Sequence, residues 1–199
     1  MKLYFAPGAC SLASHIALHE AGIDVDRVKV DLQSKRTDDG RDFLQINPKG
    51  YVPALEIEGG EVLTENVALL DWISQRAPQL APTSELGRTR QLELLAFIST
   101  ELHKQFGRVF KPTSDAEKQQ AFEKIGQRLD FLADRMAADG YLCGEDFYVA
   151  DAYLYVVLRW TVSSKRPVPA ALQGYLRRLE GRAAVRQALA HEMLEPVAG

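Results

Sequence analysis

The stretch KLYFAPGACSLASHIALHEAGI, residues 2–23, predicts a strand, a turn and a helix in that order. Residues 2–5 form a short apolar run, and the Ala-Pro-Gly sequence that follows them is a turn signal. From Cys10 to Ala21 apolar residues recur at three- and four-residue spacing, and Gly22 supplies a helix stop. A strand that passes directly into a helix is typical of the start of a βαβ unit.

The residues that follow continue this alternation of strand and helix. Alternating polar and apolar residues predict a strand at 26–32, and 43–46 fits a short helix. Residues 52–63 predict two strands joined at a Gly-Gly hairpin turn. Residues 64–77 have the pattern of an amphipathic helix, with Thr64 as the expected N-cap. The order β-α-β-α-β-β-α is typical of a thioredoxin-like sheet.

A proline-containing polar segment separates this pattern from the second half of the chain, where only helical spacing recurs. We therefore expect an α/β thioredoxin-like N-terminal domain at 1–79, a linker at 80–87 and an all-α C-terminal domain at 88–199. The helices expected in the second half are 86–109, 115–139, 149–162, 169–180 and 182–194.

Bulk composition excludes several classes of protein. Hydrophobic residues make up 46% and charged residues 26%, which is ordinary for a soluble globular protein. A net charge of -3 gives no basis for binding nucleic acid, and no apolar run approaches the ~20 residues that span a bilayer. No secretory leader pattern is visible, so we expect a cytoplasmic protein without membrane or nucleic-acid partners. Cys10 and Cys143 lie far apart in sequence and do not predict a disulfide.

Cys10 stands where the first strand gives way to the first helix. Free backbone N–H groups and the positive end of the helix dipole favour a thiolate at such a position. A cysteine placed there can act as a nucleophile near neutral pH. The alternative is a small apolar residue packed under the turn, because free cysteines are commonly buried. Cys143 follows a turn signal and is interpreted as an inert, buried thiol.

Two further features surround this thiol in the expected sheet. Pro53 opens a strand, and a cis Val52-Pro53 bond there would turn the backbone of Val52 outward to pair with an extended peptide. Glu65 and Asn66 open the next helix, where N–H groups and a short amide can hold a carboxylate. A nucleophilic cysteine, a free strand edge and an anion site together suit a small acidic thiol peptide. An ordinary trans proline and a simple helix cap are the alternatives.

The sequence resembles the bacterial beta-class glutathione S-transferases along essentially its whole length. The segments that carry the resemblance are KLYFAPGACSLASHIAL, NPKGYVPAL, LTENVALLDWI, FISTELHK and VADAYLYVVLRW, in that order. The resemblance implies a thioredoxin-like domain followed by a helical domain, a homodimer, and glutathione as cosubstrate with no metal. Small hydrophobic electrophiles are the implied second substrates, bound in a pocket of the helical domain.

For the sulfur of glutathione, the resemblance implies Cys10 as the residue that contacts it and can form a mixed disulfide with it. His103 and Lys104 match a histidine and a lysine near the thiol and the cosubstrate pocket. Ser11 is a further expected stabiliser of a thiolate. A partly buried structural histidine is the alternative interpretation of His103.

For the rest of glutathione, the resemblance implies a second set of residues. Lys35 matches the lysine that binds the glycine carboxylate. Val52, before a cis Pro53, matches the residue that pairs with the cysteinyl backbone. Glu65 and Asn66 match the pair that holds the γ-glutamyl end.

Six positions depart from the family pattern, and three of them bear on the thiol or the acceptor pocket. Phe5 offers no phenol, Ala96 offers no amide near the thiol, and Arg159 stands where a small residue is usual beside the acceptor pocket. Two functions are therefore considered. The first is a transferase that also exchanges thiols with disulfides through Cys10, and the second is a non-catalytic module that binds glutathione, hydrophobic ligands or proteins on the same fold.

His15 and His19 lie four residues apart on the first expected helix, a spacing that places two imidazoles on one face. No third ligand is suggested nearby in the sequence. We therefore expect no metal site.

Overall fold

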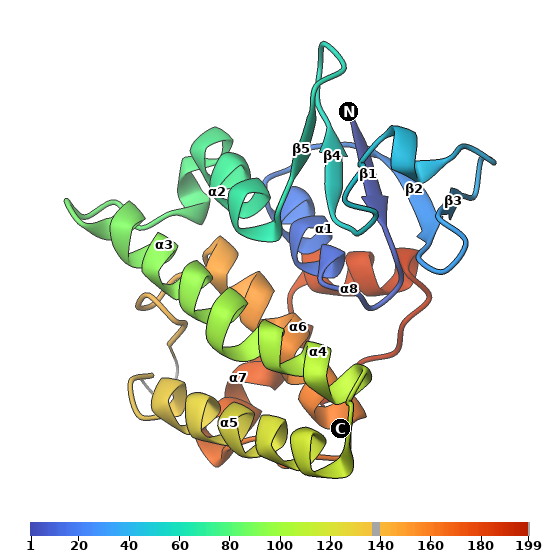
Figure 1. Ribbon diagram of the computed structural model, residues 1–199. Helices are drawn as coiled ribbons and strands as arrows, with labels where there is room; N and C mark the ends of the chain where they lie inside the picture. Colours follow the sequence, from blue (N-terminus) through green and yellow to red (C-terminus); the bar gives the residue numbers. More distant parts are fainter. Residues whose placement is uncertain (137–139, 199) are drawn as a thin grey trace.

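The computed structural model describes residues 1–136 and 140–198 (Figure 1). Its N-terminal part places a sheet beside helices, as the alternating pattern predicts. The elements of this part are β1 (Lys2–Phe5), α1 (Ser11–Glu20), β2 (Asp26–Asp31), β3 (Arg36–Thr37), the 3-10 helix η1 (Phe43–Gln45), β4 (Ala54–Glu56), β5 (Val62–Thr64), α2 (Asn66–Arg76) and the 3-10 helix η2 (Pro78–Leu80).

The five strands form one sheet in the order β3-β2-β1-β4-β5 (Figure 1). The central strand β1 runs parallel to β2, with Leu3 opposite Arg27, and antiparallel to β4, with Leu3 opposite Leu55. Alternate residues of β1 enter different cores, because side chains of a strand alternate between its faces. Leu3 and Phe5 belong to the large core shared with the helices, whereas Tyr4 packs in a smaller core with Phe43.

The predicted thioredoxin-like order is confirmed, with two local differences. The polar segment after β2 contains the two-residue strand β3, which no apolar alternation announces. Thr64 is not the N-cap of α2, because it pairs with Ala54 in the β4–β5 ladder. Glu65 takes the N-cap position instead.

The second half is helical throughout its described elements, as predicted. These are α3 (Gly87–Phe97), the π-helical segment η3 (Ile98–His103), α4 (Lys104–Phe110), α5 (Asp115–Ala133), α6 (Val149–Ser163), α7 (Ala170–Glu180) and α8 (Ala183–His191). The helix predicted at 115–139 is shorter in the structure, since 134–136 form a turn, and its expected end at 137–139 lies outside the described residues. The domain limits at 79 and 88 stay a prediction. No helix in the described residues is long and apolar enough to cross a membrane.

α6 is the buried centre of the helical half and packs against α1, the helix that follows Cys10 (Figure 1). At its first turn the buried Asp151 carboxylate accepts hydrogen bonds from the Leu142 N–H at 2.9 Å, the Tyr148 N–H at 2.8 Å and the Tyr175 hydroxyl at 2.7 Å. Burial raises the pKa of Asp151 to about 6. This carboxylate therefore joins the start of α6 to α7 and to the preceding loop.

α8 returns to the N-terminal half and packs on α1 (Figure 1). Just after α8, Glu192 is buried and accepts a hydrogen bond from the Gly8 N–H at 2.8 Å. At the other end of α1, Arg182 forms a two-point ion pair with Glu20, with Nη2 2.9 Å from Oε2. The two halves of the chain are thus joined at the turn that leads into Cys10 and at the end of α1.

Candidate functional site

The thiol of Cys10 faces the backbone of Val52. Cys10 directly precedes Ser11, the first residue of α1, and its Sγ donates to the Val52 carbonyl oxygen over 3.3 Å. The Val52-Pro53 peptide bond is cis, which confirms the prediction from the sequence. The helix start and the strand start that the sequence singled out therefore meet at one point.

The expectation of an acidified Cys10 thiol is wrong for the protein without ligand. Burial, with a smaller contribution from the carboxylate of Glu65, raises the pKa of Cys10 to about 12. The N–H groups of Cys10 and Ser11 lower this pKa, but their effect is smaller than that of burial. Position at a helix start favours a thiolate only where the sulfur keeps enough solvation, and here desolvation outweighs the dipole.

The hydroxyl of Ser11 is occupied by hydrogen bonds to the backbone of Ala6. The Ser11 side chain is fully buried, and its Oγ accepts from the Ala6 N–H at 3.2 Å and donates to the Ala6 carbonyl at 3.3 Å. These two bonds close the turn between β1 and α1. We therefore remove Ser11 from the catalytic set and assign it to the turn.

Lys35 lies at the other side of the Val52 loop. Its backbone has a φ of 58°, in the left-handed region that side chains other than glycine seldom adopt. Its ammonium donates to the Gly50 carbonyl at 2.7 Å. This contact holds a cation beside the segment that leads to Val52, and the binding of a carboxylate by Lys35 stays a prediction.

Glu65 is exposed and also has a left-handed backbone, with φ 71° and ψ 117°. Strain of this kind concentrates at ligand-binding positions. The Oε1 of Glu65 accepts from Lys49 Nζ at 2.6 Å and from the Tyr51 hydroxyl at 2.7 Å, and these two contacts lower the pKa of Glu65. Sequence reasoning missed Lys49 and Tyr51. The only signal was their place in the loop before Val52, which lies opposite the start of α2.

Asn66 is buried, and only part of its amide is satisfied. Its Oδ1 accepts from the Ser14 hydroxyl at 2.7 Å, whereas its Nδ2 has no partner among the described residues. An unpaired buried amide donor is costly, so it favours a ligand that brings an acceptor. The donor lies in the first turn of α2, where N–H groups already favour an anion.

His103 ends the π-helical segment between α3 and α4, a local distortion that recurs at functional sites. Its Nδ1 lies 2.7 Å from the Tyr153 hydroxyl of α6, and its ring centroid is 4.9 Å from that of Trp160. Burial lowers the pKa of His103, so the ring is neutral at neutral pH. Lys104, the next residue, is exposed at the start of α4.

Tyr153 connects His103 to the thiol side of the site. Burial raises the pKa of the Tyr153 hydroxyl, and the negative charge of an ionised Cys10 raises it as well. Sequence reasoning had treated Tyr153 only as part of an apolar helix. Ala96, which the sequence analysis noted for its missing amide, is exposed on α3.

Phe5 and Arg159, two of the departures from the family pattern, lie in packed regions. Phe5 is buried in the main core against the His15 ring. Arg159 donates to the Tyr155 hydroxyl at 3.2 Å and to the Glu195 carbonyl at 2.9 Å, which ties the C-terminal segment to α6. These contacts give Arg159 a structural role, and its effect on the acceptor pocket stays a prediction.

The helical pair His15 and His19 does meet a third imidazole, contrary to the expectation from sequence. His191, the last residue of α8, places its Nδ1 3.2 Å from His19 Nε2. One ring nitrogen from each of the three histidines lies within 4.8 Å of the other two. The sequence could not reveal this, because 172 residues separate His19 from His191.

Two family models match the chain. The N-terminal domain of glutathione S-transferases matches residues 8–76, and the C-terminal domain of the same proteins matches residues 115–190. The chain belongs to the glutathione S-transferase family.

Individual relatives agree with this assignment. Glutathione S-transferase GstA from Escherichia coli O157:H7 is 39% identical over 98% of this chain and 100% of its own length. A sphingomonad glutathione S-transferase solved in complex with glutathione is 44% identical, with a TM-score of 0.89 over 98% of this chain and all of that one. A beta-class transferase from Sphingomonas chungbukensis is 40% identical, with a TM-score of 0.91 over the same shares. The expected fold, the beta-class resemblance and the assignment as a glutathione-transferase enzyme are thus confirmed.

Proposed function

We propose that this glutathione S-transferase binds glutathione between α1, the Val52 loop and the start of α2. In this proposal it transfers the thiolate of glutathione to small hydrophobic electrophiles and exchanges thiols with disulfides through Cys10. The observation that carries the proposal is the 3.3 Å contact of Cys10 Sγ with the Val52 carbonyl, beside the unpaired Nδ2 of Asn66. A role in detoxification and a cytoplasmic location belong to the proposal, and two unpaired cysteines are consistent with that location.

Each end of glutathione has a matching group in this arrangement. Lys35 is proposed to bind the glycine carboxylate, since its ammonium lies at the loop before Val52. The backbone of Val52, at the cis bond to Pro53, is proposed to pair with the cysteinyl residue. Asn66 Nδ2 is proposed to donate to the γ-glutamyl carboxylate and Glu65 to accept from its ammonium group, because opposite charges attract at this half-exposed edge.

Two groups are proposed to act on the sulfur. The Cys10 thiol is protonated at neutral pH, so it can donate a hydrogen bond to a glutathione thiolate. His103 is neutral and is oriented by Tyr153, which leaves its second ring nitrogen for the substrate side. Lys104 is proposed to add positive charge near the acceptor. A donor to an anion contributes about 1.5–3 kcal/mol, enough to lower the pKa of the bound thiol by one to two units.

Thiol–disulfide exchange would proceed by attack of the Cys10 thiolate on one sulfur of glutathione disulfide. The S–S bond of the disulfide breaks, a mixed disulfide forms, and one glutathione leaves as a thiolate that takes up a proton. Because the pKa of Cys10 is raised, only a small fraction of the thiol is ionised at neutral pH. The exchange should therefore become faster as the pH rises.

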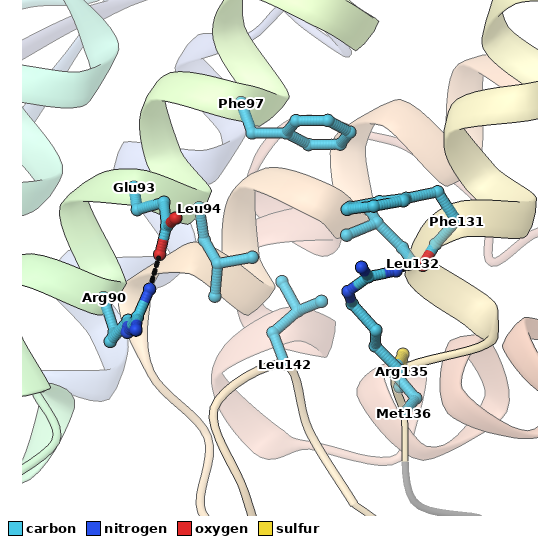
Figure 2. A pocket seen from close by; sticks show the side chains of 9 residues that line it. All are labelled: Arg90, Glu93, Leu94, Phe97, Phe131, Leu132, Arg135, Met136 and Leu142. Carbon is cyan, nitrogen blue, oxygen red and sulfur yellow. Dashed lines mark hydrogen bonds and ion pairs between the residues drawn. The ribbon is translucent and has the colours of Figure 1, made fainter.

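We also propose that the protein is a homodimer. A pocket of about 380 Å³ opens between α3 and α5 and is lined by Leu94, Phe97, Phe131 and Leu142, among others. Figure 2 shows the rings of Phe97 and Phe131 on facing helices, and their centroids are 5.3 Å apart. Leu94 and Phe97 contribute apolar side chains to this pocket, and an apolar hollow of this kind favours an inserted side chain from a second copy.

The test of the proposed function is retention on immobilised glutathione followed by conjugation of a simple aryl halide. We expect retention and a rate of conjugate formation that depends on His103. Retention without conjugation would instead support a non-catalytic binding module on the same fold. No retention would contradict the proposed site as a whole.

A further inference from the structure

Three histidines meet where α1 packs against α8. None of them belongs to the proposed glutathione site. His15 and His19 are one helical turn apart on α1, and His191 ends α8. Their rings stack in pairs, with centroids 5.0 Å apart for His15 and His19 and 5.6 Å apart for His15 and His191. The cluster contains three of the four histidines in the chain.

We propose that His15, His19 and His191 bind a divalent transition-metal ion of the zinc class. Imidazole nitrogens are preferred ligands of such ions, and three histidines with an open fourth position form a common zinc arrangement. The separation of 3.2 Å between His19 Nε2 and His191 Nδ1 fits two ligands of one tetrahedral ion, for which ~3.3 Å follows from metal–nitrogen bonds of ~2.0–2.1 Å.

The innermost ligand is already oriented for this role. His15 is 1% exposed, and its Nδ1 lies 2.9 Å from Oε1 of the buried Glu192. With Nδ1–H donated to this carboxylate, the lone pair of the ring is on Nε2, and that atom has no hydrogen-bond partner among the described residues. A carboxylate behind a metal-binding histidine fixes the ring and increases its basicity. An unpaired buried nitrogen therefore points to a ligand.

The other two imidazoles can adjust to complete the site. His19 is partly exposed and His191 is exposed, so both rings can rotate to bring all three nitrogens from within 4.8 Å to bonding distance of one ion. Burial and the neighbouring imidazoles of His15 and His191 lower the pKa of His19 to about 4, which is compatible with a neutral ligand but does not itself define a site. The nearby charges of Arg27 and Asp24 have opposite signs.

An ion at this position would join the two halves of the chain. His15 and His19 belong to the helix that begins next to Cys10, and His191 belongs to the last helix. Glu192, behind His15, also holds the Gly8 N–H in the turn before α1. The expected consequence of metal binding is therefore a more stable junction between α1 and α8, with no group placed in contact with glutathione.

The experiment is a titration of the untagged, metal-free protein with Zn²⁺ by calorimetry and with Co²⁺ by visible absorption, without glutathione or other thiols. We expect one equivalent per chain, the absorption of a tetrahedral Co²⁺ site with nitrogen ligands, and a melting temperature raised by about 5–10 °C at Zn²⁺ 100-fold above Kd. His191→Gln, a change at an exposed position, should weaken binding at least tenfold, and His19→Gln should do the same.

His103→Gln is the matched control, because it removes the fourth histidine of the chain and should leave metal affinity unchanged. The variant His191→Gln should keep its fold and its metal-free glutathione conjugation. Metal uptake unaffected by His191→Gln, a sulfur-to-cobalt charge-transfer band that disappears with Cys10→Ala, or no uptake at micromolar Zn²⁺ would each overturn the proposal.

Discussion

The Nδ1 atom of His103 and the hydroxyl of Tyr153 lie 2.7 Å apart and join the π-helical segment to the buried helix α6. The same α6 carries Trp160, whose Nε1 donates to the Gly8 carbonyl at 2.8 Å in the turn before Cys10. The position of the His103 ring is therefore set by α6, which also contacts the Cys10 turn. A change at Tyr153 should move the imidazole without removing it.

His103→Gln should reduce kcat/KM for aryl-halide conjugation about tenfold or more, because the loss of one hydrogen bond to a thiolate in the transition state raises the barrier by at least ~1.4 kcal/mol. Tyr153→Phe should give a smaller loss, since it removes only the group that orients the ring. Stopped-flow or steady-state kinetics at saturating glutathione measure both. Equal rates for His103→Gln and the wild type would exclude His103 from the chemistry.

Glu65→Gly should weaken glutathione binding about tenfold or more, as expected for the loss of a charged contact. It should not lower the free energy of unfolding, because the side chain is exposed and glycine relieves the left-handed backbone at φ 71°. Calorimetry with glutathione and urea unfolding measure the two effects separately. Lys49→Met is the matched control, because it removes the ion pair with Glu65 and keeps the Glu65 carboxylate. An unchanged affinity for glutathione in Glu65→Gly would contradict the assignment of the γ-glutamyl site.

Phe97→Glu should convert the proposed dimer into monomers, because a carboxylate cannot be buried against the apolar wall of Phe131 and Leu94 without a partner (Figure 2). Sedimentation velocity should show the wild type at twice the chain mass and the variant at the chain mass. Thr100→Glu, at an exposed position in the π-helical segment that follows α3, is a control for added charge. A wild type at the chain mass at micromolar concentration would refute the dimer.

Asp151 provides a pH dependence of stability whose sign can be derived. Its pKa is about 6 in the folded protein and about 3.9 in an unfolded chain, so the folded state binds the proton more strongly. Proton binding by Asp151 therefore adds to the free energy of unfolding. This contribution is fully present below the unfolded pKa and is lost as the pH rises through about 6. Relative to Asp151→Asn, which does not titrate, the wild type should gain about 1 kcal/mol between pH 7 and pH 5. Urea unfolding of both proteins at the two pH values measures this difference. A wild type whose free energy of unfolding falls toward pH 5, relative to that of Asp151→Asn, would contradict the raised pKa.

Much of the fold follows from local patterns in the sequence. The alternation at 26–32 and the helical spacing around 149–162 each predict one element to within a few residues, because side-chain burial has a different period in strands and helices. Strand β3 and the end of α5 were not predicted in the same way. The first is held by pairing with β2 rather than by its own apolar residues, and the second depends on where a polar helix loses its tertiary packing.

The candidate site was predictable in position but not in protonation. Cys10 and the cis Val52-Pro53 bond were identified from a helix start and a strand start. The raised pKa of Cys10 depends on how deeply tertiary packing buries the sulfur, which the helix-start position does not reveal. The link between His103 and Tyr153 joins two helices, and the meeting of His15 with His191 joins the two ends of the chain, so both required the structure.

The pH dependence of the Cys10 reaction tests the burial of the sulfur. With a pKa of about 12, the thiolate fraction rises about tenfold per pH unit, so the rate of mixed-disulfide formation should rise about 100-fold between pH 7 and pH 9. Quenched reactions with glutathione disulfide, analysed by mass spectrometry, give this rate. A flat profile over that range would mean a thiol that is already ionised at pH 7.

The central claim is that Cys10 is the thiol of the glutathione site, and the site of the adduct tests it most directly. After incubation with glutathione disulfide at pH 8.5, peptide mapping should locate one glutathione adduct on Cys10. The adduct should be absent from Cys10→Ala and retained in Cys143→Ala. Burial raises the pKa of the Cys143 thiol to about 12 as well. An adduct on Cys143, or disulfide exchange at the wild-type rate in Cys10→Ala, would contradict the account and leave Cys10 as a packing residue.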